Sequence, residues 1–256
     1  MKQGDRLDFF DHLEELRSRL MRSVIYVVVL TIVGWAVYYH AYWLIARPAE
    51  VAAHRFGGRI VITNPLEAFW VRMQVSVILG LIMAGPFLFW EAWKFVSPGL
   101  TGQERRAVLP LLFASAFLGL GGAAFCYLLC FRMFLWITGL APKGVQPLFH
   151  MGDTILLVAK LMLAFALCFQ VPVAIVILVK VGIISPDFLA RRRREAIVAL
   201  VVLAAVVTPT GDPLTLLMLA GPLYVMYEGT VAISKIIYRR RAAAIARAAT
   251  SASQGG

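Results

Sequence analysis

The stretch "VIYVVVLTIVGWAVYYHAYWLI", residues 24–45, contains no Asp, Glu, Lys or Arg. A helix needs about 20 consecutive apolar residues to cross a hydrocarbon core of about 30 Å, and this stretch is long enough. The rest of the chain has the same character, because 61% of its 256 residues are hydrophobic and only 15% are charged. Since backbone polar groups in lipid must be satisfied internally, the sequence predicts an all-α integral membrane protein.

Further apolar stretches predict six transmembrane helices in a single domain, residues 1–238. The predicted spans cover residues 20–45, 69–95, 107–137, 154–181, 196–208 and 214–237. The last two are divided by "TPTGDP", residues 208–213, because two prolines and a glycine would break a helix there. We therefore expect the last two spans to be short.

The net charge of +11 comes from 25 Lys and Arg residues against 14 Asp and Glu residues. In a soluble protein this excess would suggest nucleic-acid binding. Here the basic residues flank the apolar stretches, mostly before the first span, after the second, after the fourth and after the sixth. Because cytoplasmic loops retain Lys and Arg, we expect both termini in the cytoplasm and no nucleic-acid partner.

The two ends of the chain are polar. In the N-terminal segment, which includes "HLEELRSRL", residues 12–20, apolar residues from Phe9 to Leu20 recur along one helical face. This pattern predicts a helix over residues 8–20 that lies on the membrane surface. The tail, residues 239–256, is rich in basic and small residues, and we expect it to be disordered.

Carboxylates occur in two segments that this topology places in the cytoplasm. Glu14 and Glu15 precede the first span, and Glu104 lies in "FVSPGLTGQERR", residues 95–106. One interpretation is ordinary pairing within a helix, Glu14 with Arg17 and Glu15 with Arg19. The other is a site for a ligand that has adjacent guanidinium groups followed by an apolar segment, since arginine binds carboxylates in bidentate fashion.

Five motifs together resemble the TatC family, the multispanning receptor subunits of the twin-arginine protein translocase. They are "HLEELRSRL" (12–20), "TNPLEAF" (63–69), "FVSPGLTGQERR" (95–106), "FQVPVAIVILVKVGIISPDFL" (169–189) and "TPTGDPLTLLMLAGPLYVMYE" (208–228). They occur in the family's order and extend over most of the chain. The resemblance implies a multi-pass protein of the cytoplasmic (inner) membrane.

The resemblance also implies a set of functional residues. Glu15 and Glu104 would contact the arginines of the signal peptide. Residues implied to support this contact are Arg17, Phe95, Pro98, Leu100 and Arg105. Roles within the membrane or in the outer loops are implied for Pro48, Tyr127, Gln170 and Asp212. Gln170 departs from the family pattern, because many members have an acidic residue there and an amide cannot titrate.

The function implied is that of a core receptor. It would bind twin-arginine signal peptides of folded precursor proteins and organise TatB-like and TatA-like single-span subunits in a membrane complex with several copies. The family uses the proton-motive force as its energy source.

Two other classes of function agree less well with the sequence. A secondary transporter of a small solute remains the alternative, although such proteins gather ionisable residues at mid-membrane and the acidic residues here lie near the span ends. For an enzyme, we find no catalytic constellation, metal-ligand spacing or cofactor motif in the sequence. Cys126, Cys130 and Cys168 lie in apolar stretches and are expected to serve as small packing residues.

Overall fold

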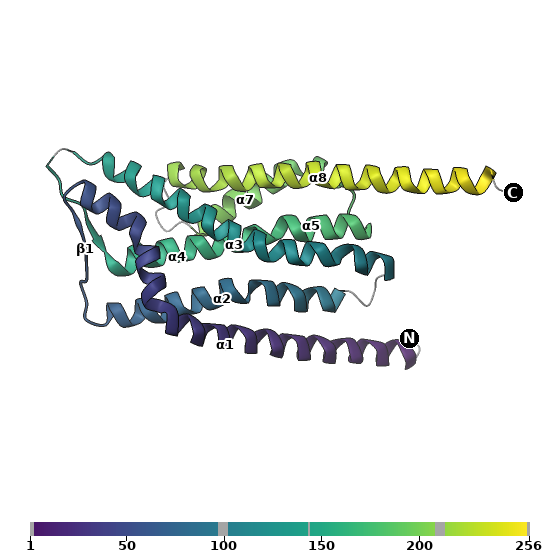
Figure 1. Ribbon diagram of the computed structural model, residues 1–256, viewed down its shortest axis with the longest axis horizontal. Coiled ribbons are helices and arrows are strands. Elements are labelled where there is room, and N and C mark those ends of the chain that lie inside the picture. Colours follow the sequence, from purple (N-terminus) through teal and green to yellow (C-terminus); the bar gives the residue numbers. More distant parts are fainter. Residues whose placement is uncertain (1–2, 97–101, 143, 208–212, 255–256) are drawn as a thin grey trace. The chain divides into compact units, whose positions relative to one another are not determined.

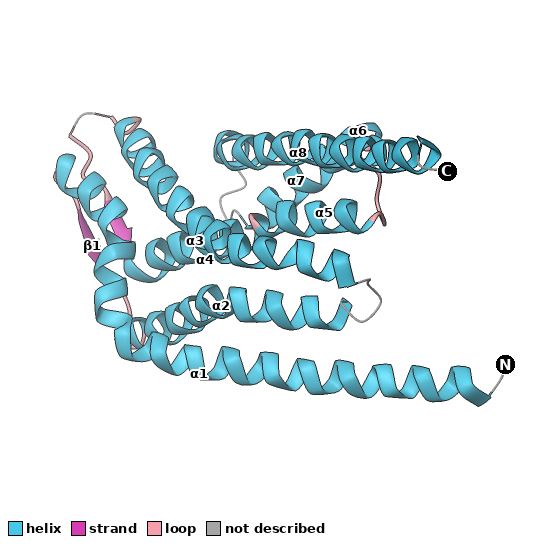
Figure 2. Cartoon of the chain, turned by 45° about the vertical axis from the view of Figure 1, so that its right-hand side comes forward, coloured by secondary structure: helices cyan, strands magenta, loops and turns pink. Residues whose placement is uncertain are grey.

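The computed structural model describes residues 3–96, 102–142, 144–207 and 213–254. It is predominantly helical, as Figure 2 shows by colour, so the all-α prediction is confirmed. Within the described residues four segments are long and apolar enough to cross a membrane: Leu13–Arg55, Glu67–Phe95, Phe113–Gly139 and Met151–Val181. They coincide with the first four predicted spans.

The chain divides into two compact units. Unit 1 comprises Met1–Gly99 and Leu112–Leu167, and unit 2 comprises Leu100–Leu111 and Cys168–Gly256. Unit 1 contains α1 (Gln3–Arg55), β1 (Arg59–Val61), α2 (Glu67–Val96), most of α3 (Gly102–Gly139), β2 (Leu148–His150) and α4 (Met151–Cys168). Unit 2 contains α5 (Gln170–Val181), α6 (Pro186–Arg191), α7 (Arg193–Val207) and α8 (Pro213–Gln254). Figure 1 labels these helices except α6, which Figure 2 labels.

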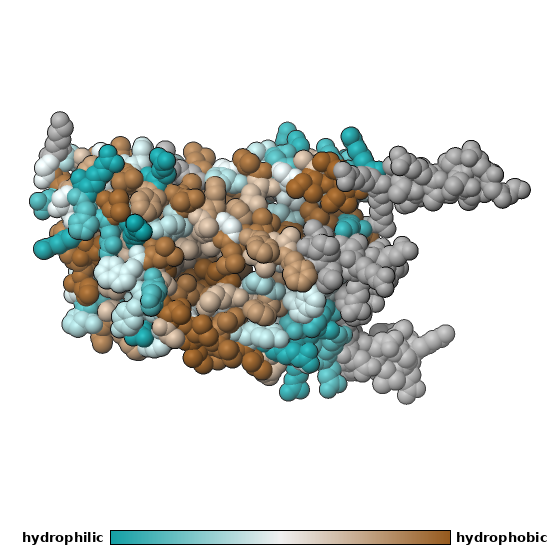
Figure 3. Space-filling model, in the orientation of Figure 1, coloured by the Kyte–Doolittle hydropathy of each residue, from teal (hydrophilic) through white to brown (hydrophobic). Residues whose placement is uncertain are grey.

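Helix α1 is one continuous helix of 53 residues. The predicted helix over residues 8–20 is thus part of α1 and continues into the first span, because no Gly or Pro interrupts the chain between Asp5 and Gly34. Apolar side chains gather over the middle of α1, at the bottom of Figure 3, between polar ones on either side. Leu16 and Leu20, which belong to the predicted apolar face, are exposed in the N-terminal part of α1.

Helices α1 and α2 lie side by side along much of their length (Figure 1). Their backbones approach closely at two glycines. A Cβ atom built on Gly34 would lie 2.7 Å from the carbonyl oxygen of Ser76, and one on Gly80 would lie 2.8 Å from the Cα atom of Thr31. Both distances are shorter than real Cβ contacts, so the two helices can pack this closely only because these residues are glycines.

A cation also joins the two helices. The guanidinium of Arg72 in α2 lies 4.2 Å from the ring centre of Trp35 and 5.0 Å from that of Tyr39 in α1. One of its terminal nitrogens donates to the backbone oxygen of Trp35 at 3.3 Å. Aromatic faces attract cations, so this contact stabilises α1 against α2.

A short parallel sheet closes one end of unit 1, and the sequence pattern did not predict it. Helix α1 is followed by Gly57, whose φ of 73° is a left-handed conformation that favours glycine. Strand β1 then pairs with β2, with Arg59 opposite Leu148 and Val61 opposite His150.

The carboxylate of Glu67, at the start of α2, holds the same end of unit 1. It accepts hydrogen bonds from the backbone nitrogen of Thr63 at 2.9 Å and from its hydroxyl at 3.0 Å. It also accepts one from the backbone nitrogen of Gly152 at 2.5 Å. Since Gly152 lies in the first turn of α4, Glu67 satisfies donors at the beginning of two helices.

Unit 2 has its own apolar core, in which Val179, Leu189 and Val231 are buried together. The hydroxyl of Tyr227 in α8 donates to the backbone oxygen of Leu189 at 2.8 Å. Arg193 in α7 pairs with Glu228 in α8 at 3.0 Å. The short helix α6 and helix α7 are thereby both attached to α8.

Several predicted boundaries change in the last third of the chain. The fourth predicted span is divided into α4 and α5, because Pro172 lacks the backbone N–H that would bond the carbonyl of Cys168. Helix α7 is short, with 15 residues, as expected. Helix α8 has 42 residues and continues to Gln254.

The sixth predicted span, residues 214–237, lies inside α8, and the tail that was expected to be disordered is helical as far as Gln254. The segment "RRRAAAIARAA", residues 239–249, is rich in Ala and Arg, which have high helix propensity and extend α8.

Candidate functional site

Two carboxylates from α1 and α2 meet at one guanidinium. Arg19 in α1 donates from Nε to the carboxylate of Glu15, one helical turn earlier, at 3.1 Å, and its Nη2 contacts the same oxygen. Its Nη1 donates to the carboxylate of Glu91 in α2 at 3.3 Å. Arg19 therefore bridges two acidic side chains that are 76 positions apart in the sequence. The predicted pair of Glu15 with Arg19 is confirmed.

Exposure falls steadily through this cluster. The side chain of Glu15 is 34% exposed, that of Arg19 is 17% exposed and that of Glu91 is 3% exposed. Glu15 can therefore meet a ligand from solvent, whereas Glu91 cannot. A carboxylate buried to this degree is costly unless it is paired, and Arg19 supplies the pairing charge.

Lys94 in α2 adds a second cation to the cluster. Its ammonium lies 3.9 Å from the carboxylate of Glu91 and 5.3 Å from the ring centre of Trp90. Glu15, Glu91, Arg19 and Lys94 together carry two negative and two positive charges. A further cation that approaches Glu15 would meet the guanidinium of Arg19, which already contacts that carboxylate.

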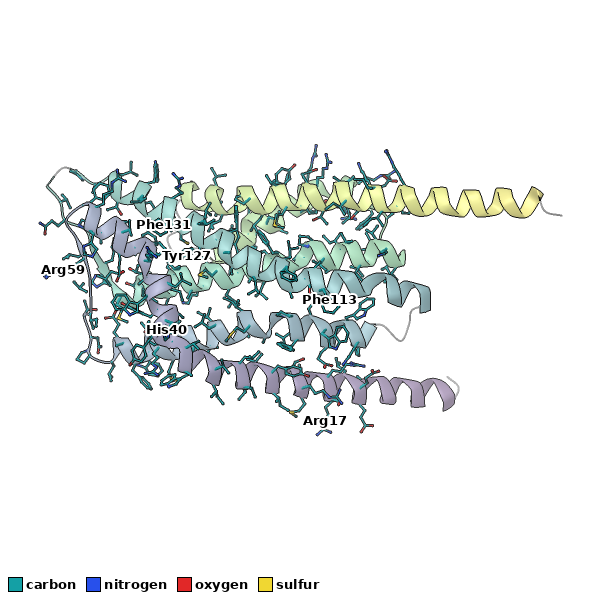
Figure 4. All side chains as sticks on the ribbon, viewed as in Figure 1. Arg17, His40, Arg59, Phe113, Tyr127 and Phe131 are labelled. Atoms are coloured by element: carbon teal, nitrogen blue, oxygen red, sulfur yellow. The ribbon has the colours of Figure 1, made fainter. Side chains whose placement is uncertain are left out.

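The remaining residues predicted for the ligand site are distributed differently. Arg17 is exposed and points away from α2 (Figure 4). Phe95 is half-buried in the last turn of α2. Pro98 and Leu100 lie outside the described residues. Glu104 and Arg105 belong to the first turns of α3, but their side chains lie outside the described part.

The residues predicted to act elsewhere occupy several elements. Pro48 is buried inside α1. Tyr127 in α3 is half-buried and lies edge-on to Phe131, with ring centres 6.1 Å apart (Figure 4). Gln170 is the first residue of α5 and is half-buried. Asp212 lies outside the described residues.

The sequence interpretation missed Glu91 and the bridging role of Arg19. A signal was available, because Glu91 lies inside the predicted span over residues 69–95, and a carboxylate in such a span usually has a partner. The partner could not be predicted, since the register of α1 against α2 depends on the close approach at Gly34 and Gly80.

The remaining ionisable side chains provide little ground for a metal site. Among the residues that the structure describes, no three His, Cys, Asp or Glu side chains are placed to hold a metal ion. Cys126 and Cys130 are buried within α3.

Comparisons with known proteins identify relatives along most of the chain. The family model of "Sec-independent protein translocase protein (TatC)" matches residues 11–222. The TatC protein of Desulforapulum autotrophicum is 32% identical over 94% of this chain and 88% of its own length. That of Escherichia coli K12 is 32% identical over 92% of this chain and 91% of its own length. A crystal structure of the twin arginine translocase receptor TatC superimposes with a TM-score of 0.80 at 29% identity, covering 88% of this chain and 99% of that one.

Proposed function

Because the chain belongs to the TatC family of Sec-independent protein translocase proteins, we propose that it is the core receptor of a twin-arginine translocation system. It binds the twin-arginine signal peptides of folded precursor proteins at the cytoplasmic face of the membrane. This role is one of binding and organisation, with no catalytic residue.

One observation carries the proposal most directly: the partly exposed carboxylate of Glu15 already binds a guanidinium, that of Arg19. Apolar side chains on the same helix, Leu16 and Leu20, are exposed nearby. A peptide with two arginines followed by an apolar segment offers both kinds of contact, since arginine pairs with carboxylates and the apolar segment covers exposed leucines.

Glu104 supplies the second carboxylate of the proposed site, and the two acidic residues take one ligand arginine each. The residues proposed to support them are Arg17, Phe95, Pro98, Leu100 and Arg105. Pro48, Tyr127, Gln170 and Asp212 keep their proposed roles in the membrane and the outer loops. The amide of Gln170 cannot exchange a proton, so its role is hydrogen bonding.

The wider assembly follows from the same proposal. Helices α7 and α8 form the fifth and sixth spans in the inner membrane. Several copies of the chain organise TatB-like and TatA-like single-span subunits, and the proton-motive force drives transport.

Binding of synthetic peptides tests the proposed function. The purified chain in lipid nanodiscs should bind a peptide with consecutive arginines more tightly than the same peptide with consecutive lysines, by about tenfold. The reason is that an ammonium cannot make the bidentate contact of a guanidinium. Titration of both labelled peptides by fluorescence anisotropy measures the difference. Equal affinities for the two peptides would contradict the proposed specificity for twin arginines.

Thiol labelling of intact cells tests the proposed topology. Val145 and Arg194 are both exposed, and the proposal places Val145 outside and Arg194 in the cytoplasm. In a variant whose three native cysteines are replaced by alanine, Val145→Cys should react with an impermeant maleimide added outside. Arg194→Cys should react only after the cells are broken. Labelling of Arg194→Cys in intact cells would contradict the orientation.

A further inference from the structure

Arg19 occupies the carboxylate that the proposed function assigns to a ligand. Its Nε and Nη2, which form one edge of the guanidinium, both contact Glu15. This edge is one that arginine uses for a bidentate contact with a carboxylate. Both nitrogens contact the same oxygen, Oε1, so a ligand arginine that binds Glu15 through both of its oxygens must compete with Arg19 for Oε1.

Glu91 offers Arg19 an alternative partner. It already accepts a hydrogen bond from Nη1 of Arg19 at 3.3 Å. Arg19 can thus leave Glu15 by rotating its side chain and still remain paired. Without Glu91 the displaced guanidinium, only 17% exposed, would stay in a poorly solvated position with no carboxylate beside it.

Glu91 is also fixed in place. It is 3% exposed on α2, and α2 is held against α1 by the close approaches at Gly34 and Gly80. Lys94 lies 3.9 Å from Glu91 and is 38% exposed, so it holds that carboxylate less firmly than Arg19 does. Glu91 therefore stays available to Arg19 whether or not Glu15 is occupied.

We propose that Glu91 is a positioning residue for ligand binding: it retains the guanidinium of Arg19 and thereby releases the carboxylate of Glu15 to an arginine of the ligand. This inference rests on the proposed function, and it adds an internal competitor, Arg19, to the proposed site. Glu91 itself does not touch the ligand.

Glu91→Gln should weaken binding of the twin-arginine peptide about tenfold, because Glu15 is then the one carboxylate partner that Arg19 keeps among the described side chains, and Arg19 holds it more tightly. The double variant Arg19→Gln with Glu91→Gln should regain wild-type affinity or exceed it, since the competitor is gone. If Arg19 and Glu91 merely stabilised the fold, replacing both should weaken peptide binding further. A recovery of affinity in the double variant is the opposite result.

The experiment uses the full chain in nanodiscs and two peptides, one with twin arginines and one with twin glutamines. The measured quantity is the ratio of their affinities, because a general loss of structure weakens both peptides alike. Glu91→Gln should lower this ratio about tenfold, and the double variant should restore it. Glu195→Gln is the matched control, since Glu195 is exposed and pairs with Arg192 three positions earlier, and it should leave the ratio unchanged.

An unchanged ratio in Glu91→Gln would overturn the role of Glu91, and so would a double variant with a ratio as low as that of Glu91→Gln. If Glu91→Gln does not fold, Glu91→Asp replaces it. Its shorter side chain should reduce the affinity ratio to a smaller extent, and no reduction would again overturn the role of Glu91.

Glu15→Gln separates this inference from the proposed function. If Glu15→Gln keeps the wild-type ratio of the two affinities, the proposed site itself is contradicted. If the ratio falls in Glu15→Gln but keeps its wild-type value in Glu91→Gln, only the positioning role is contradicted.

Discussion

Gly80→Leu should prevent α1 from packing against α2 and should leave little folded protein. A Cβ atom at this position would lie 2.5 Å from the hydroxyl oxygen and 2.7 Å from the backbone nitrogen of Thr31. The hydroxyl could rotate away, but the backbone nitrogen belongs to a continuous helix and cannot. Forcing extra atoms into such a contact costs about 1–3 kcal/mol for a small side chain, so Gly80→Ala should destabilise measurably and Gly80→Leu more strongly.

Gly85 provides a matched control for this prediction, because it lies in the same helix and a Cβ atom there would meet nothing within 4 Å. Gly85→Ala should be neutral or stabilising, since alanine favours helix by about 1 kcal/mol over glycine. Melting temperatures of the three variants in detergent, followed by tryptophan fluorescence, give the comparison. A Gly80→Leu variant that melts with the wild type would mean that α1 and α2 are not in close contact at this position.

The double variant Glu15→Ala with Glu104→Ala should lose binding of the twin-arginine peptide by about a hundredfold or more and should lose transport of a precursor. Each carboxylate is proposed to accept charge-assisted hydrogen bonds from one ligand arginine, and such bonds contribute about 1.5–3 kcal/mol each. The two sites together contribute about 3–6 kcal/mol, and about 2.8 kcal/mol already corresponds to a hundredfold in affinity. Peptide titration and export of a reporter precursor measure the two effects.

Glu14→Ala is the control for that experiment. Glu14 is exposed and adjacent to Glu15, so it carries the same charge without contacting Arg19 in the structure. We expect only a small effect, through the general field at the surface. The proposed carboxylate site would be contradicted if the double variant bound the peptide with wild-type affinity. It would also be contradicted if Glu14→Ala lost as much affinity as the double variant.

The apolar spans could be predicted from sequence because their length and composition are set by the membrane, and the first four coincide with described helices. What the pattern could not provide were contacts between elements. Strands β1 and β2 have three residues each, and their parallel pairing depends on where α1 and α3 end. Burial of Glu91 against Arg19 likewise depends on helix register.

Glycines illustrate the same limit. In the run "LGLGG", residues 118–122, a Cβ atom on Gly121 would meet nothing within 4 Å. The close contacts occur instead at Gly34 and Gly80, isolated glycines in two different spans. The sequence shows where a glycine is, but the position of the facing helix determines whether close packing requires a glycine there.

The two ends of the α1 and α2 pair are held by different kinds of bond. At the end that carries β1 and β2, backbone pairing and the hydrogen bonds to Glu67 fix the chain. At the other end, side-chain ion pairs around Arg19 can exchange partners without moving a helix. Amide hydrogens of β1 should therefore exchange slowly and those of the N-terminal turns of α1 quickly. A peptide bound at Glu15 would be accommodated locally, by rotation of side chains, and α1 would not have to move as a rigid body to receive it.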